Sequence, residues 1–351
     1  MTNHTNRISS VPSPEIDCYT TAKSSVGWCR QDVDVVVGRG NDRLDLLQRL
    51  TTNDVVKLSG TDRSNTDQGG AGVQNILLTD KARIIDVFTV LARENDIVML
   101  FSAGMGAKAV EWLDKYTFID DFTTDNQSTN YASFLVFGVR AQQLLEQLTG
   151  IVLHDVRAFS WMKSTILGST EVILIKQQPL CGFCARLLVS AADAEVVTEV
   201  LRGLEGVAEI DDATFETLRI EAAWGKHGKE WTDERNPLEA GLVGLVDFKK
   251  GCYIGQEVIA RLDTYNKVKV RLSGFLSDAP IPETARFYDG LEEKRTDIGG
   301  ITSSTFSPEL GEYIALGYIR SAFANPGATV EAGAEGGYEA ELRITKLPFV
   351  M

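Results

Sequence analysis

The stretch FETLRIEAAWGKHGKEWTDERNPLEAGLVGLVDFKKGCYIGQEVIARL, residues 215–262, divides the 351-residue chain into two parts of different texture. Before it, apolar β-rich runs alternate with helical patterns. After it come short strands and many glycines, without a helical pattern. Residues 215–224 have helical spacing and follow a pair of aspartates that can cap a helix. Three ring-bearing side chains then fall within eight positions: Trp224, His227 and Trp231.

The most distinctive part of this stretch is KGCYIGQE, residues 250–257, which we term the signature segment. Gly251 and Gly255 flank its cysteine, tyrosine and isoleucine. Glycine lets a backbone adopt a positive φ or pass close to a neighbour. The residues alone leave two interpretations open: a tight turn into a helix that starts near Gln256, or a loop that contacts a ligand.

The N-terminal part predicts layered α+β or α/β structure. Residues 76–101 form three apolar runs separated by polar turns, as in an antiparallel meander. Residues 59–72 contain almost nothing apolar and predict a mobile loop. The predicted strands are 33–37, 76–78, 84–91, 97–101, 131–138, 170–175 and 185–190. The predicted helices are 107–115, 141–148, 191–201 and one that runs from a cap at Asn41 or Asp42 to Leu50.

The C-terminal part, beyond Lys267, predicts a small β-barrel or sandwich. Its short apolar runs are separated by glycine-containing turns, and no helix is expected there. The predicted strands are 268–275, 300–305, 314–319, 328–331 and 338–345.

Composition excludes several classes of protein. With 44% hydrophobic and 24% charged residues, the chain is neither wholly disordered nor fibrous. A net charge of −14 disfavours non-specific binding to nucleic-acid backbones. No apolar run is long enough to cross a membrane. Residues 1–16 lack the apolar core of a secretory signal, so we expect a disordered tail there.

Cysteine and histidine usage gives two further expectations. Five cysteines, an odd number, indicate reduced thiols and a cytoplasmic location. The three histidines are far apart and form no ligand pair, so we expect no metal site. The Cys181–Cys184 pair has redox or half-metal-site spacing, but the following residues predict a strand rather than the helix that a redox motif requires.

The signature segment resembles that of the YgfZ family, folate-binding proteins related to the glycine-cleavage T-protein. Four other stretches are also similar to that superfamily: residues 46–58 (LLQRLTTNDVVKL), 77–90 (LLTDKARIIDVFTV), 218–242 and 299–320, and so is the terminal LPF. The resemblance covers roughly residues 33–349. It implies an α+β fold of three domains arranged as a ring, and a monomer. The division it implies is residues 17–52 with 131–250, residues 53–130, and a C-terminal β-barrel over residues 262–351.

The resemblance also implies a tetrahydrofolate site in the central hole of the ring. Glu221, in LRIE, would bind the pterin, since a carboxylate can accept two parallel N–H bonds from a guanidine-like edge. Four more residues are implied as folate contacts: Ser102, Lys250, Tyr253 and Gln256.

Two residues are candidates for chemistry. Asp86 matches one acid of the Asp-Asp pair of T-proteins, whereas the second position is Val87. Ser102 and residues 179–186 also depart from the T-protein pattern. Cys252 is the thiol of the signature segment, and the adjacent Lys249 and Lys250 would favour its thiolate.

Three functions remain open. The first is a tetrahydrofolate-binding accessory protein that supports iron–sulfur cluster assembly or repair and cluster-dependent tRNA modification, with iron–sulfur proteins as partners. The second is an aminomethyltransferase that moves a one-carbon unit onto tetrahydrofolate. The third is a folate-free scaffold. The missing acid at Val87 and the presence of the signature segment favour the first.

Overall fold

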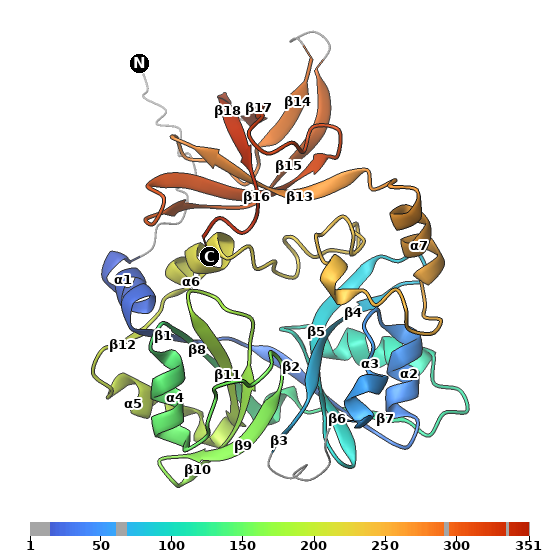
Figure 1. Ribbon diagram of the computed structural model, residues 1–351, viewed down its shortest axis with the longest axis vertical. Coiled ribbons are helices and arrows are strands. Elements are labelled where there is room, and N and C mark those ends of the chain that lie inside the picture. Colours follow the sequence, from blue (N-terminus) through green and yellow to red (C-terminus); the bar gives the residue numbers. More distant parts are fainter. Residues whose placement is uncertain (1–14, 61–68, 291–294, 335–336, 351) are drawn as a thin grey trace, which may run out of the picture.

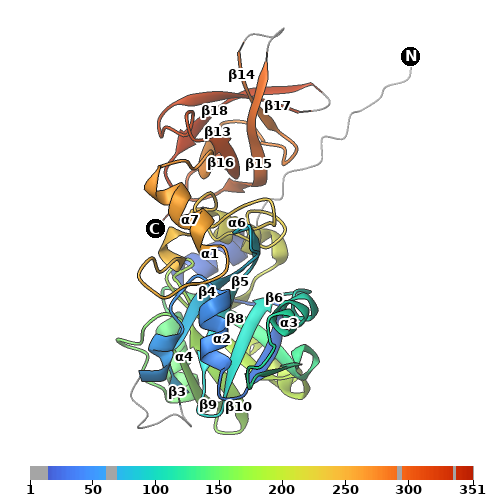
Figure 2. The same ribbon diagram turned by 90° about the vertical axis from the view of Figure 1, so that its right-hand side faces the viewer.

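Three β-sheet units surround the middle of the molecule in the computed structural model, which describes residues 15–60, 69–290, 295–334 and 337–350. A closed barrel lies at one end, and two open sheets lie side by side below it (Figure 1). In the perpendicular view the barrel again caps one end, with helix α7 (Gln256–Thr264) between it and the sheets (Figure 2). The α+β ring with a C-terminal barrel is therefore confirmed.

The first unit is a seven-stranded sheet in the order β12-β1-β8-β11-β10-β9-β3. Alternate side chains of its central strands point to opposite faces, as the strand period of two requires. Trp28, Phe134 and Val136 pack under helices α4 and α5, whereas Leu135 and Phe137 pack under α1 and α6. The strands are β12 (Val207–Glu209), β1 (Val26–Arg30), β8 (Tyr131–Gly138), β11 (Phe183–Ser190), β10 (Thr170–Lys176), β9 (Trp161–Ile166) and β3 (Gly69–Gly70). The helices are α1 (Ile16–Ser24), α4 (Ala141–Thr149), α5 (Ala194–Arg202) and α6 (Asp212–Glu221).

The second unit is a five-stranded sheet in the order β4-β5-β6-β2-β7, which contains the predicted antiparallel meander. Helices α2 and α3 cover one of its faces, mainly through leucines, and Phe122 from the segment before β7 packs in the same cluster. Its other face packs on the first sheet, where Val35 and Leu100 meet Trp161 and Leu188. The elements are β4 (Gly72–Leu78), β5 (Ile84–Ala92), β6 (Asp96–Ser102), β2 (Val33–Arg39), β7 (Thr123–Asn126), α2 (Arg43–Leu50) and α3 (Gly106–Lys115).

The third unit is a closed barrel, β13-β16-β15-β14-β17-β18, rather than a sandwich. Its core is apolar and includes the tilted ring pair of Phe275 and Phe287, with centroids 4.4 Å apart. Helix α6 connects the barrel to the first sheet, because Ile220 packs against Ile314 and Leu316. The strands are β13 (Val270–Ser277), β14 (Arg286–Asp289), β15 (Thr296–Ser307), β16 (Glu312–Arg320), β17 (Thr329–Ala334) and β18 (Tyr338–Thr345).

Several expectations need correction. Ile16 begins helix α1, and residues 1–14 of the expected tail lie outside the described residues. Of the expected loop 59–72, residues 61–68 lie outside the described residues, while Gly69 and Gly70 pair with β9. Helix α6 ends at Glu221 instead of Trp224. Strand β2, which was grouped with residues 17–52 and 131–250, hydrogen-bonds within the five-stranded sheet.

None of the described helices is long and apolar enough to cross a membrane.

Candidate functional site

Two adjoining cavities open where the three units meet. The first, which we term the cationic cavity, has a volume of about 310 Å³ and is lined by both sheets, helix α6 and the loop after it. The second, the apolar cavity, has a volume of about 380 Å³ and is also lined by Leu272 of the barrel and by Leu347 and Pro348. The two cavities share a wall made of five residues: Gln74, Gln177, Trp224, Gly225 and Trp231.

The cationic cavity combines aromatic rings, amides and positive charge. Asp32 is the single carboxylate among its described lining residues, and the Asp32 side chain is 81% exposed. Four basic side chains line the same cavity: Arg186, Arg219, Lys226 and His227. Aromatic rings and side-chain amides complete the wall: Phe101, Phe215, Trp224, Trp231, Gln31, Gln74 and Gln177. This wall suits a ligand that is both aromatic and anionic.

Asp86 and Ser102, two of the candidate site residues, lie together. The Asp86 carboxylate is fully buried and accepts the backbone N–H of Ser102 at 2.8 Å and its hydroxyl at 2.7 Å. Nδ1 of His227 lies 3.4 Å from Asp86 Oδ1. Ser102, His227 and Val87 line the cationic cavity, whereas Asp86 lies behind them. Asp86 therefore orients the wall and does not form its surface.

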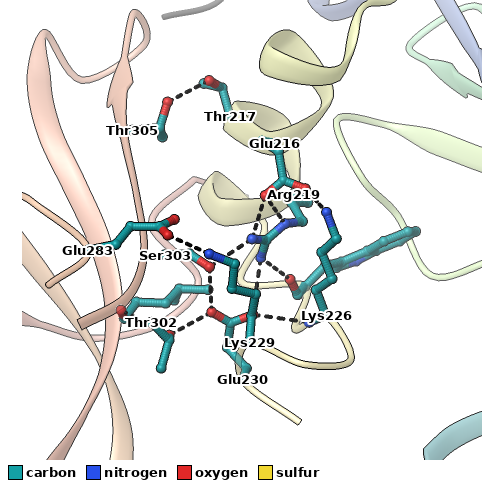
Figure 3. Close-up of polar contacts among 12 residues, drawn as sticks. Glu216, Thr217, Arg219, Lys226, Lys229, Glu230, Glu283, Thr302, Ser303 and Thr305 are labelled. Carbon is teal, nitrogen blue, oxygen red and sulfur yellow. Dashed lines mark hydrogen bonds and ion pairs between the residues drawn. The ribbon is translucent and has the colours of Figure 1, made fainter. Parts of the chain in front are cut away.

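Arg219 is fixed by a buried acid. Its guanidinium donates to Glu230 at 3.2 Å and to the carbonyl of Trp224 at 3.1 Å. Glu230 is fully buried and also accepts the hydroxyls of Thr302 and Ser303 of the barrel and the backbone N–H of Lys226. Figure 3 shows how these contacts join α6, the loop after it and the barrel. The network holds the 222–231 loop in place as one wall of the cavity.

Glu221 lies elsewhere. Its carboxylate accepts the hydroxyls of Tyr19 and Ser307, and Lys23 is 4.0 Å away. Burial raises the pKa of Glu221. The residue ties α1 and the barrel to α6 and is not among the lining residues of either cavity. Its predicted role as a pterin ligand has no support from this position.

The signature segment is a joint between units, and its residues do not line either cavity. Lys250 is buried and donates from Nζ to the carbonyls of Thr51 and Asn53, both at 2.7 Å. Burial lowers the pKa of Lys250 to about 8. The backbone N–H of Ile254 donates to the carbonyl of Arg49. These contacts fasten the turn after α2 to the segment before α7.

Other residues of the signature segment also serve this joint. Gly255 has a φ of +78°, and a Cβ there would lie 3.0 Å from the carbonyl oxygen of Thr79 in the β4–β5 turn. Tyr253 is buried in the apolar cluster beneath this turn, and burial raises its pKa to about 12. Gln256 is the first residue of α7, which confirms the helix start, and Cys252 is exposed. Lys250, Tyr253, Gln256 and Cys252 are not among the residues that line the two cavities.

The remaining cysteines are embedded in the first unit. Cys184 is buried in strand β11, as its strand-like context predicted, and burial raises the pKa of Cys181 to about 12. Among the residues that the structure describes, no group of three His, Cys, Asp or Glu side chains could hold a metal ion.

Several residues that dominate the cavity were not predicted as site residues from the sequence. Arg186 lies in an apolar strand, and His227 and Lys226 lie in an irregular loop. A charged residue within a buried strand pattern was the available signal for Arg186, because such a residue needs a partner or a ligand.

Comparison with known proteins agrees with this geometry. Residues 31–250 match the GCVT N-terminal domain, and residues 271–350 match the glycine cleavage T-protein C-terminal barrel domain. An aminomethyltransferase from Listeria monocytogenes is 27% identical over 90% of this chain and 83% of its own. A chloroplastic protein of Arabidopsis thaliana, named as a transferase, is 30% identical over 84% of this chain and 65% of its own.

The fold has a solved counterpart. The crystal structure of glycine cleavage system aminomethyltransferase T from Bartonella henselae superposes with a TM-score of 0.81, at 19% identity, over 95% of this chain and 89% of that one. Both the N-terminal and the barrel domain descriptions are matched, and together they span most of the chain. The chain therefore belongs to the glycine cleavage T-protein family.

Proposed function

We propose that this protein binds tetrahydrofolate in the cationic cavity and acts as an accessory factor of the YgfZ type. In that role it supports iron–sulfur cluster assembly or repair and cluster-dependent tRNA modification. The observation that carries the folate assignment is the wall of the cationic cavity, in which aromatic rings, amides and cations converge.

Each part of folate has a matching group in this wall. The pterin and aminobenzoyl rings are flat, and Trp224, Trp231 and Phe215 offer aromatic faces to stack on. The pterin edge carries hydrogen-bond donors and acceptors, which the amides of Gln31, Gln74 and Gln177 can pair. The glutamate tail carries carboxylates, which arginine and lysine bind with charge-assisted hydrogen bonds.

The residue at the second acidic position of the T-protein pattern supports the accessory role. An aminomethyltransferase needs a carboxylate near the reacting folate nitrogen, but Val87 lines the cavity at the second acidic position. Asp86 is fully buried and already accepts two hydrogen bonds from Ser102. The exposed thiol of Cys252, on a different part of the surface, is open to a protein partner.

Aminomethyl transfer is the second candidate, because relatives over most of the chain are named aminomethyltransferases. An assay with lipoyl-bound methylamine and tetrahydrofolate separates the two. Formation of methylenetetrahydrofolate would favour transfer. Its absence, in a protein that binds tetrahydrofolate, would favour the accessory role.

The folate assignment is tested by anaerobic calorimetric titration with tetrahydrofolate. We expect wild type to bind and Trp231→Ala to bind more weakly by about 1–3 kcal/mol, the value of one stacked ring. Trp112→Ala, on α3, is the matched control and should bind like wild type. Glu221→Gln should also retain affinity, since Glu221 lies off the cavities. A folded wild type that does not bind would remove folate from the proposal.

A further inference from the structure

Arg186 is an inward-facing cation in the middle of the seven-stranded sheet. It lies on β11, paired with Leu135 of β8 and Ile175 of β10, and its side chain reaches the cationic cavity. Its Nη1 donates to the hydroxyl of Ser133 and, at 3.4 Å, to the carbonyl of Gln31. Both acceptors are neutral, so neither balances the charge.

The charge of Arg186 is uncompensated. It takes part in no ion pair among the described residues, whereas the neighbouring Arg219 and Lys226 both pair with Glu216, and Arg219 also with Glu230. Asp32 lines the same cavity, but its described ion pair is with Arg30 at 3.9 Å. Arg186 is half-buried, at the wall of the cavity. Even partial burial of an unpaired cation costs free energy, so a site of this kind favours an anion from outside the protein.

The free part of the guanidinium also specifies the shape of that anion. With Nη1 engaged, Nε and Nη2 have no acceptor among the described residues. These two N–H groups lie on one edge of the planar guanidinium and match the two oxygens of a carboxylate. Aromatic rings also line the cavity, so the anionic group could belong to a larger organic ligand whose flat part stacks on these rings.

We propose that Arg186 binds a carboxylate of the ligand that occupies the cationic cavity, through a two-pronged contact from Nε and Nη2. The inference rests on the proposed function in one respect: if the ligand is tetrahydrofolate, its glutamate supplies one source of the carboxylate. The other source is a small carboxylic acid that occupies the cavity beside the folate. The same hydrogen-bonding edge serves both.

Burial adds support. It lowers the pKa of Arg186, and the two side chains that act against this effect are Cys184 and Cys29 rather than a carboxylate. A bound carboxylate would supply the missing partner. Ligand binding should therefore also stiffen β11 and the β1–β2 connection that carries Gln31.

The test compares wild type with Arg186→Gln, Arg186→Lys and a control, Arg140→Gln, which is exposed on the same unit. Three probes are titrated anaerobically by calorimetry: tetrahydrofolate, the amide of tetrahydropteroate (which keeps both ring systems and has no carboxylate) and acetate, with chloride at equal ionic strength as the reference. We expect Arg186→Gln to lose about 10- to 100-fold in affinity for the carboxylate probe and Arg186→Lys to lose less.

The three probes distinguish the two possible sources of the bound carboxylate. If the glutamate is bound, Arg186→Gln weakens the binding of tetrahydrofolate and leaves the binding of the tetrahydropteroate amide unchanged. If a small acid is bound, Arg186→Gln retains tetrahydrofolate affinity and loses acetate binding. An Arg186→Gln protein that binds both tetrahydrofolate and acetate like wild type would overturn the inference.

Two further outcomes keep the inference open to refutation. Should Arg186→Gln not fold, wild type alone decides: equal affinity for tetrahydrofolate and the tetrahydropteroate amide, with no acetate binding beyond chloride, overturns the inference. If wild type does not bind tetrahydrofolate but binds acetate through Arg186, the folate proposal fails and the carboxylate site stands.

Discussion

The signature segment and the cationic cavity differ in how their polar groups are satisfied. The ammonium group of Lys250, in the signature segment, donates hydrogen bonds to two backbone carbonyls of the same chain. Arg186 of the cavity leaves one edge of its guanidinium without a protein acceptor. The segment that is easiest to recognise in the sequence is thus a structural joint, and the surface that can take a ligand is assembled from four or more separate segments. The most distinctive string in a chain need not be its binding site.

The largest effect is expected from the acid that supports the cavity wall. Glu230→Gln removes one of the two carboxylates that pair with Arg219 and should lower the free energy of unfolding by about 3 kcal/mol, because the buried guanidinium then keeps only Glu216, which it shares with Lys226. Urea denaturation measures it. The control is Glu283→Gln, whose pair with Lys229 is exposed and should cost about 0–1 kcal/mol. Equal losses in the two variants would contradict the importance of the buried network.

A smaller effect is expected at the joint. Lys250→Met leaves the carbonyls of Thr51 and Asn53 without their donor and should cost about 2 kcal/mol near neutral pH. Folate affinity should stay unchanged. The exposed neighbour Lys249 provides the control variant, Lys249→Met, with little change in either quantity. If Lys250→Met folds but no longer binds folate, the conclusion that the joint and the cavity have separate roles would be wrong.

The same residue gives a pH dependence with a definite sign. Its pKa is lowered to about 8 in the folded protein, below the ordinary value of 10.5. Between these values the unfolded chain binds more protons, so this contribution to stability rises as the pH rises. The difference in unfolding free energy between wild type and Lys250→Met should therefore grow from pH 8 toward pH 10.5. Urea denaturation of both proteins at several pH values measures this difference. A difference that stays constant from pH 8 to pH 10.5 would contradict the prediction.

Two glycines sharpen the comparison further. A Cβ on Gly225 would run into the indole of Trp231, which is shared by both cavities, whereas a Cβ on Gly251 of the signature segment would meet open space. Gly225→Ala should weaken tetrahydrofolate binding about tenfold, equivalent to about 1.4 kcal/mol of overpacking. Gly251→Ala should bind normally. Calorimetry on both proteins checks this, and an unaffected Gly225→Ala would place the ligand away from the Trp231 wall.

The smallest effect on the fold is expected at Cys252. Because the thiol is exposed, Cys252→Ser should change the free energy of unfolding by less than about 0.5 kcal/mol and leave folate affinity unchanged. In the proposed accessory role, however, the variant should fail to support cluster-dependent tRNA modification in cells that lack the wild-type protein. Full support by Cys252→Ser would exclude the thiol from the function.

Much of the fold was predictable because burial repeats at regular spacing. The apolar runs that became β5, β6, β8 and β10 alternate or persist long enough to be read as strands, and the meander and the barrel followed from them. Strand β7, Thr123–Asn126, was missed because its four residues are polar and it forms by pairing with β2. Helix α1 was missed because many of its contacts are with residues far along the chain, such as Leu135, Phe137 and Glu221.

The cavity was less predictable for a related reason. Asp86 and Ser102 could be placed together from neighbouring strands of the meander. Glu221 was expected at a ligand, but Tyr19 of the unrecognised α1 and Ser307 of the barrel occupy its carboxylate. Arg186 and His227 each carry a local signal, a charge in an apolar strand and a place in the ring-bearing cluster, but only tertiary packing brings them to one cavity.

The hydrogen bond from Lys250 to Thr51 spans 199 positions in the chain, and that from Tyr19 to Glu221 spans 202. During synthesis, at about 5–20 residues per second, the early partners wait roughly 10–40 seconds for the late ones to leave the ribosome. Until then the turn after α2 lacks its contact with Lys250, and α1 lacks its contact with Glu221. We therefore expect a nascent chain stalled before residue 215 to be far more protease-sensitive at both places than one stalled after residue 257, and to be the form that chaperones bind.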